Sequence, residues 1–179
     1  MQMTRIRALV VVGILSIAAL VLVVVTVGRD SQGGDTTAET CQPGNIPVSL
    51  ELPESESEIN INVFNATQTV GLGANVAADF KNRKFNVGKV EGEKENGADK
   101  YFPEEVAILR YGPKTVGAAH LLRAYFLNET TTQFDLKRED DVVDVVIGGR
   151  FKQLATPTEM RQAVAILGRP KLPPGTCEG

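Results

Sequence analysis

The sequence predicts an α+β fold, a split βαβ (βαββαβ) two-layer sandwich whose mainly antiparallel sheet carries two helices on one face, preceded by a transmembrane helix. Two observations predict it. The chain begins with a long uncharged run, and later segments repeat apolar residues at every second or every fourth position. Period two indicates strands, and a period near four indicates amphipathic helices. With 179 residues we expect one folded domain with one core.

The uncharged run covers residues 8–27 and consists mostly of Val, Leu, Ile and Ala. As a helix it spans about 30 Å, the thickness of a bilayer core. Arg5 and Arg7 precede it, so residues 1–7 are predicted to stay in the cytoplasm and the rest of the chain to lie outside a single-pass cell membrane anchor. The alternative is a cleaved signal peptide, but its apolar region is usually only about 7 to 15 residues long.

Residues 28–40, GRDSQGGDTTAET, hold nothing that anchors packing and indicate a flexible linker to a domain at 41–179. Beyond Arg29 the chain has 16 basic and 22 acidic residues, a net charge of about -6. Binding to a phosphate backbone requires a basic stripe, so nucleic acid is not an expected partner.

Two cysteines, Cys41 and Cys177, bracket the predicted domain. Outside the cell they predict a disulfide that closes a loop of about 135 residues, worth at most about 4 to 5 kcal/mol. The alternatives are free thiols or a bond between chains. Two distant cysteines and a single histidine do not complete a tetrahedral metal shell, so neither a metal nor a cofactor is expected.

The first half of the domain alternates strand and helix signals. Residues 59–65 place Ile59, Ile61 and Val63 on one face, which predicts a strand. A helix is predicted over 70–83 and a second strand over 85–90, followed by an exposed charged loop, EGEKENGADK.

The second half repeats this order. A strand is predicted over 106–111, and Pro113 suits the first turn of a helix over 114–127. Phe134 and Leu136 suggest a short strand, and the apolar run at 142–147 indicates a buried one. A last helix is predicted over 157–167, ending at a glycine.

Two motifs carry a family resemblance: INVFNATQTVGLGANVAADFKNRKFNV and, later, DVVDVVIGGRF. Over about residues 59–151 the chain resembles the LytR C-terminal domain family, in which a strand leads through an Asn-Gly-Thr-like turn into a Gly-Leu-Ala-like helix. The chain departs from this pattern at Ala66 and at Lys84, where glycine is usual. If Lys84 takes a left-handed conformation, it costs about 1 kcal/mol.

The resemblance implies a stand-alone, membrane-anchored domain of the actinobacterial type, associated with cell-envelope integrity. We therefore expect a non-catalytic module that binds peptidoglycan, lipoglycan or envelope proteins. Two alternatives stay open: an accessory regulator or subunit of an envelope glycopolymer phosphotransferase, and an enzyme that acts on the envelope.

The candidate ligand or partner surface combines a helix-start loop with residues near strand ends. Free backbone donors at a helix start can receive an anion, although glycines there more often serve close packing, and Arg and Tyr suit a groove for glycan or phosphate. The candidates are Asn65, Thr67, Gly71, Gly73, Arg110, Tyr111 and Arg150.

Catalytic residues are not expected. His120 is the only histidine, has no nucleophile motif nearby, and is expected to be a solvated helix residue. The acidic groups Glu104 with Glu105 and 139–141 can in principle supply acid and base, but adjacent carboxylates usually face water.

Overall fold

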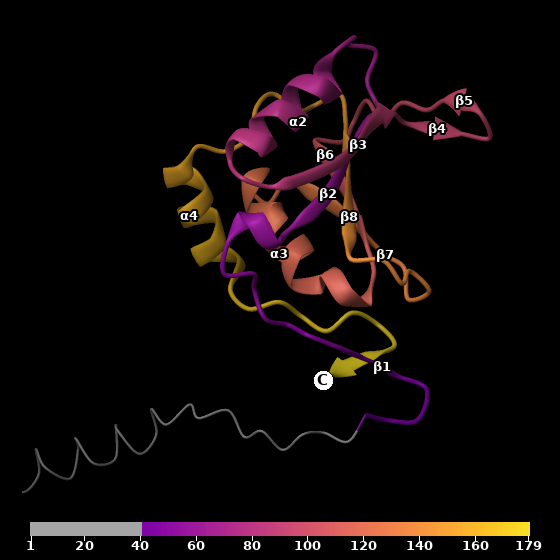
Figure 1. The fold of residues 1–179 in the computed structure, drawn as a ribbon, viewed down its shortest axis with the longest axis vertical. Helices are drawn as coiled ribbons and strands as arrows, with labels where there is room; N and C mark the ends of the chain where they lie inside the picture. The colour runs from indigo at the N-terminus through magenta and orange to yellow at the C-terminus, as the bar shows by residue number, and fades with distance from the viewer. Residues whose placement is uncertain (1–40) are drawn as a thin grey trace, which may run out of the picture. The chain divides into compact units, whose positions relative to one another are not determined.

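The computed structural model describes residues 41–179 (Figure 1). The predicted transmembrane helix at 8–27 and the linker at 28–40 lie outside the described residues. Within 41–179 no helix is both long and apolar enough to cross a bilayer.

A five-stranded sheet forms the centre of the domain (Figure 1). Its spatial order is β3-β2-β8-β6-β7. The bounds are Asn60–Asn65 for β2, Asn86–Gly92 for β3, Ala107–Tyr111 for β6, Thr130–Phe134 for β7 and Val142–Ile147 for β8. Within this sheet β2–β3, β2–β8 and β6–β7 are parallel and β6–β8 is antiparallel. The sheet is mixed, so the predicted mainly antiparallel arrangement is wrong.

The helical connections explain the parallel pairs. Helix α2 (Leu72–Asn82) joins β2 to β3, and α3 (Val116–Tyr125) joins β6 to β7. A helical crossover returns the chain to the end at which the first strand began, so the next strand runs parallel to it. Each crossover here connects two strands that are adjacent in the sheet. In a split βαβ unit, the two strands joined by the helix have another strand between them. Strand β8 instead joins the two units at the centre of the sheet.

The helices cover one face of the sheet, as predicted for two of them (Figure 1). Helix α4 (Pro157–Leu167) packs beside α3, at the bounds that the sequence predicted. Thr156 caps α4 because its hydroxyl accepts from the Glu159 amide while the Glu159 carboxylate accepts from the Thr156 amide. The 3₁₀ turns η1 (Glu56–Glu58) and η2 (Pro113–Thr115) precede β2 and α3.

The core lies between the sheet and the helices. Phe80 of α2 is fully buried, and Phe85 stands edge-on to both Phe80 and Tyr125, with ring centroids 5.0 Å apart in each pair. From the sheet, the inward-facing residues of alternate positions fill the other side of the core: Ile61, Val63, Leu109, Val143, Val145 and Ile147. The alternation predicted for residues 59–65 is confirmed.

Strand β7 begins earlier than the sequence predicts. Leu127 and Asn128 both have positive φ, 54° and 66°, which ends α3 and turns the chain at once. The strand that follows, TTTQF, is a mostly exposed edge strand. It has no apolar alternation to mark it, and Leu136 lies beyond its end.

Short strand pairs complete the domain. The predicted charged loop contains the hairpin of β4 (Lys94–Glu95) and β5 (Ala98–Asp99), which projects from the sheet in Figure 1. Asn96 and Gly97 form its turn with φ of 52° and 84°, and Asn-Gly is a strong hairpin signal that a loop prediction overlooks.

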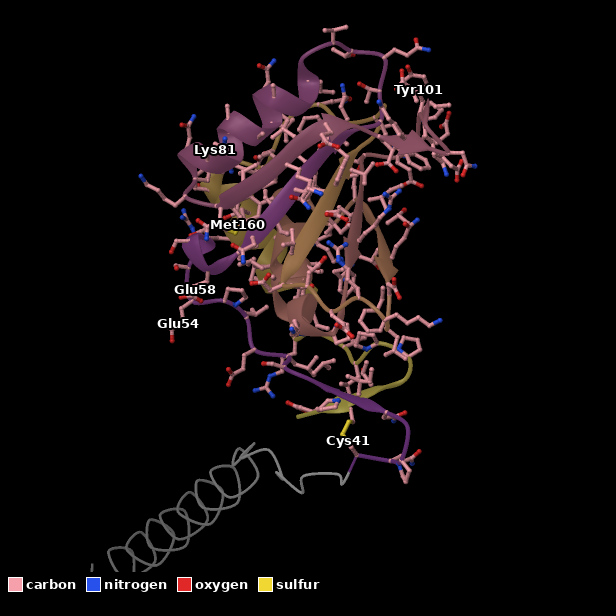
Figure 2. The ribbon with its side chains drawn as sticks, turned by 45° about the vertical axis from the view of Figure 1, so that its right-hand side comes forward. Cys41, Glu54, Glu58, Lys81, Tyr101 and Met160 are labelled. Carbon is pink, nitrogen blue, oxygen red and sulfur yellow. A yellow bond between two sulfur atoms is a disulfide. The ribbon has the colours of Figure 1, made fainter. Side chains whose placement is uncertain are left out.

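The two ends of the domain meet in a parallel pair of β1 (Ile46–Val48) and β9 (Thr176–Glu178). The predicted disulfide between Cys41 and Cys177 is confirmed, with Cα atoms 5.6 Å apart, and Figure 2 shows its yellow bond beside this pair. Each strand has only three residues and its partner is distant in the chain, so no local pattern predicts them.

Lys84, which stands where the family pattern usually has glycine, adopts the left-handed backbone conformation, with φ of 78°. It follows α2, where a glycine is the usual residue for such a turn. Its side chain is exposed, so the cost lies in the backbone.

Candidate functional site

Asn65 and Thr67 hold the loop between β2 and α2 together. The Asn65 Nδ2 donates to the Thr69 carbonyl at 2.9 Å, and its Oδ1 accepts from the Thr67 amide at 3.1 Å and hydroxyl at 2.8 Å. The Thr67 hydroxyl in turn accepts from the Thr69 amide at 3.1 Å. The polar groups of both candidates are therefore used in folding this loop.

The two glycines serve the start of α2 in different ways. Gly71 has φ of 79°, a conformation that suits glycine. Gly73 is buried, and a Cβ at its position would lie 3.2 Å from the Asn65 Cβ. The structure therefore favours the packing interpretation of these glycines over anion binding.

The remaining candidates do not meet. Arg110 and Tyr111 are consecutive in β6 and so point to opposite faces of the sheet. Arg150 lies past the far end of β8, where its Nη2 is 4.0 Å from Glu129 and both side chains are 62% exposed. The structure thus divides the predicted surface among four places: the loop before α2, the two faces of β6, and the segment after β8.

Arg110 belongs to a polar sheet face, which lies opposite the helices. There its Nη2 lies 2.8 Å from Glu93 and its Nε donates to Gln133 at 3.0 Å. Glu93 is buried, whereas the Arg110 side chain is 29% exposed, so the carboxylate is the shielded partner of this ion pair. We use "polar sheet face" for these residues and for a second group centred on Arg138.

Arg138 ties the second group together. Its Nη1 donates to Asp144 at 2.8 Å and its Nε to Asp140 at 2.7 Å. Asp144 also accepts from the Asn62 side chain at 2.9 Å. The hydrogen bond from Arg138 holds the pKa of Asp140 below its usual range. The arginines of this face are therefore neutralised by the protein's own carboxylates.

A second polar surface lies on the helical side of the domain. A cleft of about 480 Å³ opens between α3, the neighbouring strands β6 and β7, and residues 166–171, which include the end of α4 and the segment after it. Its basic lining residues are His120, Arg123, Arg169 and Lys171. Within 41–179, no aspartate or glutamate lines it. We call it the cationic cleft.

Tertiary packing places the basic residues of this cleft. Arg123 lies on α3, and its Nε is buried and finds no hydrogen-bond partner in the described part of the chain. His120 is half-buried, and its Nε2 donates to the Gly168 carbonyl at 3.0 Å, since a carbonyl only accepts. His120 is therefore a partly exposed helix residue, and its hydrogen bond ties α3 to the segment that carries Arg169 and Lys171.

Tyr111 contributes the phenol of the cleft. Burial raises the pKa of the Tyr111 hydroxyl, while the charge of Arg123 acts in the opposite direction. A tyrosine hydroxyl is protonated at neutral pH at its ordinary pKa of about 10, so the Tyr111 hydroxyl is available as a donor.

A further hollow, of about 420 Å³, is acidic instead. It is lined by Glu51, Glu54, Glu58 and Asp141 together with Lys114. Figure 2 shows Glu54 and Glu58 close to each other at the surface. Across residues 41–179, no group of three or more His, Cys, Asp or Glu side chains is placed to hold a metal ion.

Sequence reasoning missed Arg123, Arg169 and Lys171. Arg123 sits on a predicted helix like any solvated basic residue, and RPKLPPG at 169–175 has no periodicity. The only sequence signal for this cleft was that basic residues follow α4 in a domain that has more acidic than basic residues. Only the contact between α3 and α4 brings them together.

Comparisons with known proteins place this fold in a family. Residues 58–151 match the model of LytR_C, described as LytR cell envelope-related transcriptional attenuator. The fold is similar to the crystal structure of the soluble domain of a conserved hypothetical secreted protein from Mycobacterium marinum. That match has a TM-score of 0.51 and 21% identity, and it covers 73% of this chain and 92% of the other. Among curated proteins none matches. The family match spans more than half of the chain and includes both sequence motifs, so the protein belongs to the LytR_C family.

Proposed function

We propose that this protein is a non-catalytic, membrane-anchored extracytoplasmic module that supports cell-envelope integrity by binding envelope glycans, lipoglycans or proteins. The observation that carries the proposal is the LytR_C match over residues 58–151, whose description refers to the cell envelope. A binding role also agrees with a domain that has clefts at its surface.

The disulfide supports a location outside the cytoplasm. Cys41 and Cys177 lie near the two ends of the domain and are joined by a disulfide. Disulfide bonds persist in oxidising compartments. The apolar run at 8–27 supports anchoring, because its length suits a bilayer core.

The state of the acidic and basic groups supports a role without catalysis. Glu104 and the residues at 139–141 are exposed, and Asp140 pairs with Arg138. Glu105 accepts a hydrogen bond from the Thr131 hydroxyl at 2.7 Å. A general acid or base usually has a pKa shifted toward neutral pH by burial or a like charge, and the pKa of Asp140 is shifted the other way.

Crosslinking in intact cells tests the proposal. The full chain would carry a photoactivatable residue in place of Lys152, which is exposed, and crosslinked material would be identified after solubilisation. We expect peptidoglycan, lipoglycan or envelope proteins in the products. Recovery of cytosolic partners alone would contradict the proposal. Capture of one envelope phosphotransferase without glycan would favour the accessory regulator instead.

A measurement of topology separates location from binding. A membrane-impermeant protease added to intact spheroplasts is expected to remove residues 41–179 and leave the N-terminus protected. Protection of the whole chain would refute the extracytoplasmic location whatever the crosslinks show.

A further inference from the structure

The cationic cleft differs from the polar sheet face in whether its basic side chains contact carboxylates. On the polar sheet face each arginine contacts a carboxylate. In the cleft, Arg123, Arg169 and Lys171 form no salt bridge with any residue of 41–179. Cations gathered without counter-charges repel one another, so a bound anion relieves that repulsion. This occurs in a part of the chain that has more acidic than basic residues.

The donors of the cleft match the oxygens of a phosphoryl group. Arg123 offers a guanidinium whose Nε has no acceptor in the described part of the chain. Guanidinium and ammonium groups make short, charge-assisted hydrogen bonds to phosphate, and guanidinium binds two oxygens at once. Tyr111 and Thr132 add hydroxyl donors from the neighbouring strands. The cleft therefore gathers several hydrogen-bond donors, three of them on basic side chains.

The cleft also has apolar lining residues, Val116, Ala119, Ile166, Leu167 and Pro170. The Ile166 side chain is 81% exposed, which is unusual for isoleucine and leaves apolar area for a ligand to cover. A cleft of about 480 Å³ falls within the range of small organic ligands and far exceeds a lone inorganic ion. The ligand therefore has an anionic end and an uncharged remainder.

We propose that the cationic cleft binds an organic phosphate ester, with the phosphoryl group among Arg123, Arg169 and Lys171 and the remainder against the apolar lining residues. The proposal deepens the proposed binding function and rests on it for its envelope setting. Two sources supply this chemistry, a lipid headgroup and a phosphorylated sugar.

Calorimetry on the full chain in a maltoside detergent, which carries no phosphate, tests the proposal. The probe is butyl phosphate, and pentanoate is its carboxylate counterpart. The double variant Arg169→Gln, Lys171→Gln removes two exposed cations of the cleft with little risk to folding. The matched control, Lys152→Gln, Arg161→Gln, removes two exposed cations that do not line it.

We expect saturable binding of butyl phosphate to the natural protein and to the control, and at least about tenfold weaker binding to the cleft variant. Arg123→Lys is expected to weaken binding as well, because an ammonium does not bind two oxygens in a plane. Absence of saturable binding, an equal loss in the control, or equal affinity for pentanoate would each overturn the proposal.

Competition then identifies the source. Displacement of butyl phosphate by short-chain phosphatidylglycerol supports a lipid headgroup, and displacement by glucose 1-phosphate supports a sugar phosphate. Displacement by neither overturns the assignment to an organic phosphate of these kinds.

The failures of the two proposals are distinguishable in cells. If the natural protein crosslinks to envelope material but shows no saturable binding of butyl phosphate, the cleft proposal fails and the envelope function stands. If the natural protein binds butyl phosphate but yields only cytosolic crosslinks, the envelope function fails and the cleft remains a phosphate site.

Discussion

Removing the disulfide is expected to be the largest single loss of stability available outside the core. The change is the double variant Cys41→Ser, Cys177→Ser, which avoids leaving a free thiol. The bond joins residues separated by 136 positions. On the chain-entropy model, a closed loop of this size restricts the unfolded chain by about 5 kcal/mol, an upper estimate. With an unfolding slope of about 2 kcal/mol per molar urea, the midpoint falls by about 2.5 M.

Tyrosine fluorescence during urea unfolding measures this loss on the full chain. Tyr101, Tyr111 and Tyr125 are the only tyrosines and all lie in the described domain, so the signal reports that domain alone. The natural protein under a reductant is the matched control and should unfold with the double variant. If reduced, oxidised and variant proteins all unfold within about 1 kcal/mol of one another, the reasoning from loop closure is refuted.

Three further outcomes are expected. Lys84→Gly should raise the free energy of unfolding by about 0.5 to 1 kcal/mol because the φ of 78° suits glycine, and a loss would contradict this. Phe80→Ala should cost about 3 to 5 kcal/mol since its ring is fully buried, against less than about 0.5 for exposed Lys81→Ala, and equal effects would refute the assigned core. Asp140 should titrate below its unfolded pKa of about 4, so its contribution to stability is present above that pH and is lost as the pH falls through the folded value. Carboxyl NMR should show the Asp140 pKa rising in Arg138→Gln, and an unchanged value would count against that hydrogen bond.

Several features of the fold could be predicted from the sequence because their causes are local. Helix α4 has its cap, its proline and its final glycine within one segment, and its bounds were predicted without error. The strand at 142–147 follows from a short apolar run alone. The disulfide could be predicted because only two cysteines exist and both flank the domain.

The candidate site was predicted less well, for a physical reason. Residue type identified Arg110, Tyr111 and Arg150 as able to bind a ligand, but type does not say which partners they meet. Arg110 is neutralised by Glu93, which is distant from it in the sequence and contacts it only in the folded sheet. Conversely, Arg123 resembles any helix arginine until α4 packs beside it.

The sequence by itself determined the periods of the strands and helices, the family motifs and the covalent link between Cys41 and Cys177, because each depends on neighbouring residues or on composition. Only the tertiary structure decided that the sheet is mixed and that a cleft of unpaired cations forms beside α3. Strand order and charge pairing depend on contacts between segments far apart in the chain, and no local pattern of residues encodes them.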